Sequence, residues 1–149
     1  MSFSEYTSTQ HSSIEQKTFK FHAFFVSTSQ QYFMTTIPFQ AIDWNTIPAT
    51  EHPGESGTAF WQTLLYDGLR VRIVEYSAGY IADHWCQKGH IVHCLEGEFV
   101  SEMSNGESFK LTVGMTYIVS DDMSSHRSTS ATGVKLLIVD GDFLAKSSM

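Results

Sequence analysis

Residues 34–149 consist of short apolar or alternating runs separated by Gly-containing turns, and no run shows the 3.6-residue period of a long helix. Strands are expected over residues 58–65, 69–76, 80–86, 90–96, 99–103, 107–113, 115–119 and 134–140. Turns are expected at Asp67-Gly68, Glu96-Gly97, Asn105-Gly106, Val113-Gly114 and Gly141. Many short strands at even spacing predict an all-β sandwich or barrel, and their number suits a double-sheet jelly roll.

The run 69–76 shows the alternation that a half-buried strand requires. Leu69, Val71 and Ile73 alternate with Arg70 and Arg72, so one face of this strand is apolar and the other carries charge. We expect the charged face to lie at the surface. The segment before these strands, residues 51–57, is polar and Gly-rich and is expected to form an irregular entrance loop.

The charge balance limits the classes of partner. Sixteen Asp and Glu against nine Lys and Arg give a formal net charge of -7, which repels nucleic-acid phosphates and anionic lipid headgroups. A small neutral or cationic ligand fits this charge better. Two cysteines are too few for a disulfide scaffold, and no apolar run reaches the roughly 18 residues that span a bilayer. We therefore expect a soluble cytoplasmic protein that binds neither nucleic acid nor membrane.

Residues 1–33 differ in composition from the rest of the chain. They hold fifteen Ser, Thr and Gln and no Gly or Pro, and their one apolar cluster, residues 19–26, is interrupted by Lys20 and His22. That interruption argues against a secretory signal. Two interpretations stay open for this N-terminal extension: a disordered or loosely docked segment, or an arm that pairs with a sheet edge through its Phe residues. The folded barrel is then expected over residues 34–149.

Three candidate metal ligands, His84, Cys86 and His90, lie within seven positions. On a strand His84 and Cys86 share a face, Gly89 permits a sharp corner, and His90 opens the next strand where the two strand ends converge. Imidazole and thiolate ligands suit a divalent transition metal (Zn, Fe, Ni or Cu) better than Mg or Ca. The alternative is that these side chains only fill the barrel interior, since free Cys is among the most buried residue types.

Residues 79–97 resemble the first motif of the cupin superfamily, in which Gly is followed by His-x-His, then Glu, then a further Gly. In this chain the motif positions hold His84, Cys86, His90 and Gly97. The stretch from Gly114 to His126 is similar to the second cupin motif, with His126 at the ligand position.

More narrowly, Ala82-Asp83-His84-Trp85-Cys86 followed by Lys88-Gly89-His90 resembles a group of small uncharacterised cupins named for an Asp-His-Cys-Trp (DHCW) motif. The resemblance implies the cupin jelly-roll barrel (double-stranded β-helix) and a metal pocket, without naming a reaction. It also implies homodimerisation.

The resemblance implies the metal ligands His84, Cys86, His90 and His126. A typical cupin site is three His and one Glu, so this set exchanges a carboxylate for an imidazole and an imidazole for a thiol. If all four side chains bind, the site is closed like a structural zinc site. If Cys86 stands off, three His and an open position remain, which is a catalytic arrangement.

Three hypotheses about function follow from these residues. The first is a metal-dependent enzyme acting on a small polar molecule, with no catalytic residue assigned. The second is a non-catalytic module that binds a small ligand or the metal itself. The third is a metal-free structural cupin in which the four side chains only pack.

Overall fold

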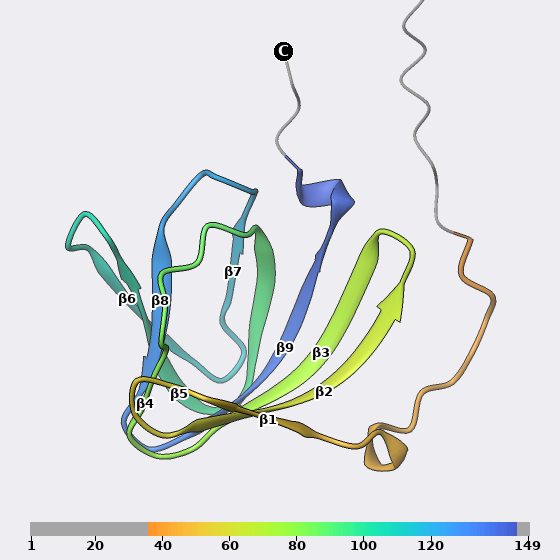
Figure 1. Cartoon of the computed structure of the whole chain (residues 1–149), viewed down its shortest axis with the longest axis horizontal. Helices are drawn as coiled ribbons and strands as arrows, with labels where there is room; N and C mark the ends of the chain where they lie inside the picture. The colour runs from red at the N-terminus through yellow and green to blue at the C-terminus, as the bar shows by residue number, and fades with distance from the viewer. Residues whose placement is uncertain (1–35, 146–149) are drawn as a thin grey trace, which may run out of the picture. The chain divides into compact units, whose positions relative to one another are not determined.

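The computed structural model describes residues 36–145, which form strands and two short 3-10 turns (Figure 1). The elements are η1 (Trp44–Thr46), β1 (Thr50–Pro53), β2 (Thr58–Tyr66), β3 (Leu69–Tyr76), β4 (Tyr80–Ile81), β5 (His90–Met103), β6 (Ser108–Thr112), β7 (Thr116–Val119), β8 (His126–Ser130), β9 (Val134–Gly141) and η2 (Asp142–Leu144). Neither 3-10 turn, and so no helix in this part of the chain, has the length and apolarity of a membrane span. The extension predicted at residues 1–33 lies outside the described residues.

The long strand β5 belongs to two sheets. Its first part pairs antiparallel with β7 and β9, and its last part pairs antiparallel with β6 and β8. The strand order β1-β2-β3-β9-β5-β8-β4 places β6 and β7 on β5 outside this path. In Figure 1 the strands curl around a common interior, with β2 and β3 on one side and β6 and β8 on the other. This arrangement confirms the all-β prediction and agrees with a jelly roll.

A β-bulge lets one strand serve both sheets. The register of β5 against β9 shifts between Cys94 and Glu96. Before the shift His90, Val92 and Cys94 are buried, and after it Phe99 and Ser101 are buried, so the inward parity changes from even to odd numbers. The extra residue of a bulge has this effect because it moves the following side chains to the opposite face.

The turn predicted at Glu96-Gly97 is therefore wrong, because β5 continues through this point. Gly97 has a φ of +74°, a left-handed conformation that glycine adopts without steric cost. Here that conformation serves the bulge and not a reversal of the chain. A Cβ atom at Gly97 would also collide with the carbonyl oxygen of Gly133.

The buried core lies where the two sheets face each other. Its members are Val74, Val92, Cys94, Phe99, Leu111, Val134, Leu136 and Ile138. Trp61, Tyr76 and Tyr117 pack against this core while partly exposed. The core residues come from β3, β5, β6 and β9, so the apolar contacts hold both sheets together.

Three predicted elements differ from the structure. The strand expected over residues 80–86 is reduced to Tyr80–Ile81 and an isolated bridge from Cys86 to His126. The irregular loop expected over residues 51–57 contains β1, which pairs with β2. The strand β8 was not predicted, because its Ser- and Thr-rich sequence lacks an apolar alternation although both of its end residues are buried.

Gly97→Ala should lower the free energy of unfolding, because the new Cβ meets both an unfavourable φ and the backbone of Gly133. We expect a loss of about 1–3 kcal/mol from the strained conformation, with the collision adding to it. Urea denaturation measures the difference. Gly106→Ala is the matched control, because Gly106 has a φ of +93° with nothing within 4 Å of the added Cβ. Equal losses of unfolding free energy for the two variants would mean that the contact with Gly133 does not affect stability.

Candidate metal centre

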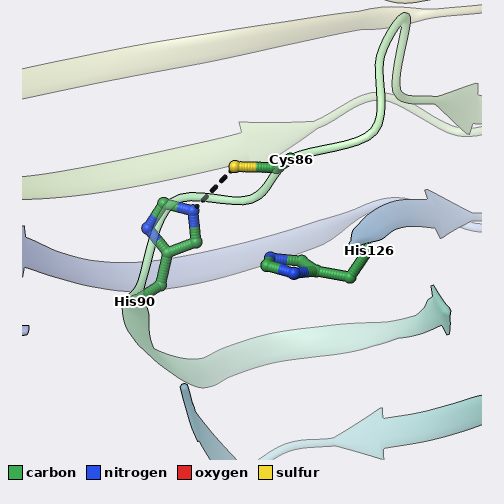
Figure 2. Close-up of side chains that lie close together, drawn as sticks. All are labelled: Cys86, His90 and His126. Atoms are coloured by element: carbon green, nitrogen blue, oxygen red, sulfur yellow. Dashed lines mark hydrogen bonds between the residues drawn. The ribbon is translucent and has the colours of Figure 1, made fainter. Parts of the chain in front are cut away.

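Cys86, His90 and His126 bring one potential ligand atom each to within 4.8 Å of the others (Figure 2). Cys86 lies between β4 and β5, His90 is the first residue of β5, and His126 is the first residue of β8. Two backbone hydrogen bonds join Cys86 to His126. The Cys86 N–H donates to the His126 carbonyl at 2.7 Å, and the His126 N–H donates to the Cys86 carbonyl at 3.0 Å. We call these three residues the Cys-His-His cluster.

Both histidines direct Nδ1 away from the cluster, toward an oxygen atom. His126 Nδ1 lies 2.8 Å from the Ser124 hydroxyl oxygen. His90 Nδ1 lies 3.5 Å from Asp140 Oδ2, an ion-pair distance, and makes no hydrogen bond within the described residues. His90 Nε2 lies 3.3 Å from Cys86 Sγ, while His126 Nε2 is buried with no partner in the described part of the chain. His126, with an oxygen partner on Nδ1 and no partner on Nε2, shows the usual arrangement of a metal-binding imidazole.

The electrostatic environment favours the metal-binding forms of Cys86 and His126 but not that of His90. Burial opposes ionisation of the Cys86 thiol, but the hydrogen bond and charge of His90 outweigh it and lower the pKa of Cys86. Burial would lower the pKa of His90, but the contacts with Asp140 and Cys86 raise it. Burial, with a contribution from the charge of His90, lowers the pKa of His126 to about 4. His126 is therefore a neutral imidazole at pH 7, the form that binds metals.

Asp140 lies behind the cluster and holds two arginines. Its Oδ1 accepts a hydrogen bond from Arg70 Nε at 2.9 Å, and its Oδ2 accepts one from Arg72 Nη2 at 2.7 Å. Both the Asp140 and Arg72 side chains are almost fully buried, at 4% and 5% exposed. Burial would raise the pKa of Asp140, but contacts with His90, Arg70 and Arg72 hold it well below its usual range.

The prediction that Arg70 and Arg72 form a surface face is therefore wrong. The alternation along β3 is present, but the face with the arginines is the one that points into the barrel. The reason is Asp140 on β9, which pairs with Arg70 in the strand register and neutralises part of the charge. Cross-strand partners cannot be identified from the sequence of β3 alone.

His84, the fourth predicted ligand, lies outside the Cys-His-His cluster although it lines the same cavity. Its side chain is 68% exposed, and its Nδ1 lies 2.6 Å from Asp83 Oδ1. The expectation that His84 and Cys86 share a face depended on strand geometry, and residues 82–85 do not form a strand. The expectation that Asp83 faces away from His84 fails for the same reason.

The remaining His and Cys near the site have structural roles. His93 Nδ1 lies 2.8 Å from the Thr116 hydroxyl, and His93 takes no part in the cluster, as expected. Cys94 is fully buried in the core, and both cysteines are free thiols, so the absence of a disulfide between Cys86 and Cys94 agrees with the prediction.

A cavity of about 280 Å³ opens over the cluster. The aromatic residues in its wall are Trp61, Tyr76, Tyr80 and Tyr117. The cluster forms part of the same wall, so a small molecule in the cavity would contact the candidate ligands.

Asp140 and Ser124 are functional candidates that the sequence analysis missed. The signal for Asp140 was present: Val134, Leu136 and Ile138 point inward on β9, and Asp140 continues this parity as the one acidic residue of the series. A carboxylate on an otherwise apolar inward face requires a partner in the interior. Ser124 precedes its partner by two positions in a Ser-rich loop, and nothing in the sequence distinguishes it from Ser125.

No protein-family model and no curated protein matches this sequence. Solved structures match its fold. A predicted oxalate decarboxylase from Thermotoga maritima is 16% identical with a TM-score of 0.60, over 68% of this chain and 98% of that one. An RmlC-like cupin from Shewanella frigidimarina is 20% identical with a TM-score of 0.56, over 72% and 94% of the chains. Ectoine synthase from P. lautus is 18% identical with a TM-score of 0.57, over 73% and 80%. At these identities the likeness concerns the fold, and it confirms the jelly-roll prediction.

Asp140→Asn should destabilise the barrel strongly, because it leaves two arginines, one of them buried, without their shared carboxylate. We expect a loss of about 3–5 kcal/mol in the free energy of unfolding, measured by urea denaturation. Glu75→Gln is the matched control, because the Glu75–Lys135 pair is partly exposed and its removal should cost at most about 1 kcal/mol. A loss for Asp140→Asn no larger than for Glu75→Gln would contradict the importance of the buried pairs.

Proposed function

We propose that this chain, which has the cupin jelly-roll fold, binds one divalent transition-metal ion through Cys86, His90 and His126 and acts on a small polar molecule in the adjoining cavity. The observation that carries the proposal is the unpartnered, buried Nε2 of His126, whose ring points toward the other two side chains while Ser124 occupies Nδ1 (Figure 2). Without an ion, this nitrogen is a buried polar atom with no partner, an arrangement that costs free energy.

The donor set fits zinc, iron, nickel or copper. Imidazole and thiolate are intermediate to soft ligands, whereas Mg and Ca require oxygen. A bound ion of this kind supplies a Lewis-acid or redox centre with a coordination position open to a small ligand. The protein residues supply the rest: Ser124 orients the His126 imidazole, the Asp140 carboxylate lies beside His90 Nδ1, and aromatic side chains form part of the cavity wall.

Three protein ligands rather than four favour an enzyme over a closed structural site. Similar structures named as ectoine synthase and as a predicted oxalate decarboxylase support action on a small molecule in this fold. The second candidate function is a non-catalytic module that holds the metal or a small ligand. Consumption of O₂, or turnover of a thiol, sugar or keto acid by the metal-loaded protein, separates the enzyme from the module.

His126→Ala should remove most of the bound metal while the barrel still folds. The test is elemental analysis of untagged protein, in which the wild-type chain should hold about one Zn, Fe, Ni or Cu. His93→Ala is the matched control, because His93 lies on the same strand as the cluster residue His90, bonds to Thr116 and is outside the cluster. Full metal occupancy in His126→Ala would refute the assignment.

His84→Ala tests the four-ligand set expected from the sequence. Because the His84 ring is exposed and bonds to Asp83, we expect this variant to keep more metal than His126→Ala. Elemental analysis of the two variants in parallel gives the answer. If His84→Ala loses as much metal as His126→Ala, His84 is the fourth ligand and the loop at residues 82–85 changes conformation when the ion binds.

A further inference from the structure

Two hydrogen-bond donors in the cavity wall have no acceptor. Arg72 Nε and Trp61 Nε1 are both buried, and neither has a partner in the described part of the chain. The two side chains are neighbours, since the Arg72 guanidinium carbon lies 4.6 Å from the centre of the Trp61 ring. Both atoms can only donate, so no rotation of either group could satisfy the other. The missing partner must therefore be an acceptor.

The charges around the cavity also indicate an acceptor that is negative. The charged side chains in its wall, His aside, are Arg70, Arg72, Lys88 and Arg127, and no carboxylate is among them. Lys88 pairs with Asp121, and Arg127 pairs with Glu102 and more distantly with Glu55.

Arg70 and Arg72, in contrast, share the single carboxylate of Asp140. Arg72 is 5% exposed and Arg70 is 34% exposed, so these two guanidinium groups, one of them within reach of water, have one carboxylate between them. An anion that entered the cavity would give this pair of cations a second negative partner.

We infer that the cavity binds a small carboxylate, held by Arg72 and Trp61 beside the Cys-His-His cluster. A planar guanidinium matches the two oxygens of a carboxylate, and the Trp61 N–H adds a donor that fixes its orientation. Asp140 Oδ2 contacts both Arg72 and His90, so the carboxylate site is separated from the cluster by a single side-chain oxygen.

The remaining atoms of a small organic acid would therefore lie against the cluster. A small carboxylate is then the class of molecule on which the proposed function acts. The carboxylate site rests on that proposed function only in having a metal ion beside it.

The experiment is isothermal titration calorimetry on the full chain after removal of metal, so that chelation of an ion contributes nothing. The probes are acetate, malonate and glutarate, each paired with its neutral amide, with inorganic phosphate as a further anion. At least one carboxylate should bind, and its amide should not, because only the carboxylate neutralises the extra charge of Arg70 and Arg72.

Two conservative variants test the donors separately. Arg72→Lys keeps the charge and removes Nε, and it should weaken carboxylate binding about 10-fold or more. Trp61→Phe keeps a ring and removes the N–H, and it should weaken binding by about 2- to 12-fold.

The controls are Arg127→Lys, another cation of the cavity wall with its own acidic partners, and Trp85→Phe, an exposed indole outside the wall. Both should stay within about 2-fold of the wild type. Circular dichroism confirms that each variant is folded, and Trp61→Phe alone decides the inference if Arg72→Lys does not fold.

The inference is overturned if no carboxylate binds, if both donor variants bind as tightly as the wild type, or if phosphate binds more tightly than every carboxylate. Elemental analysis of the same preparation before metal removal keeps the two proposals apart. Carboxylate binding by a chain that never held metal would support the carboxylate site and refute the metal site. Bound metal without any carboxylate binding would support the metal site and refute the carboxylate site.

Discussion

The carboxylate of Asp140 connects the parts of the interior that carry function. Arg70 and Arg72 from β3 and His90 from β5 all converge on it from the two strands that flank β9. Without this carboxylate, Arg72 could not remain buried and His90 would lose the oxygen beside its Nδ1. The orientation of the candidate metal ligand and the position of the unpaired arginine donor therefore depend on the same side chain.

Stability alone does not account for this group of charges. Well-packed apolar side chains in place of a buried ion pair are often neutral or stabilising, because each charge loses its hydration. The core a few residues along β9 shows that this strand can carry such side chains at inward positions, as Leu136 and Ile138 do. A group of two arginines and one aspartate, with one donor unpaired, is better explained by a ligand that uses it than by folding.

The fold was predictable from sequence because its signals are local. The Asp-Gly turn and the runs on either side of it predicted β2 and β3 to within one residue. Cys86 and His90 could be chosen because they lie on the two sides of one chain corner, whereas His126 was chosen only from the resemblance to the second cupin motif, since its strand β8 was not predicted. His84 did not join them, since its placement assumed strand geometry at residues that form none. Asp140 and the inward arginines could not be placed, because which face of β3 points inward depends on a cross-strand partner 68 residues away.

The net charge illustrates the same limit of sequence reasoning. A charge of -7 led us to expect a neutral or cationic ligand, yet the cavity wall carries four cations and no carboxylate. Surface charges are separated from the cavity by water and salt, which screen them beyond about 10 Å. A ligand inside the barrel interacts mainly with the nearest groups, in a medium of lower dielectric constant where each unpaired charge has a larger effect. The acidic surface and the cationic interior are therefore compatible, and the interior, with its unpaired donors, determines which ligand the barrel can hold.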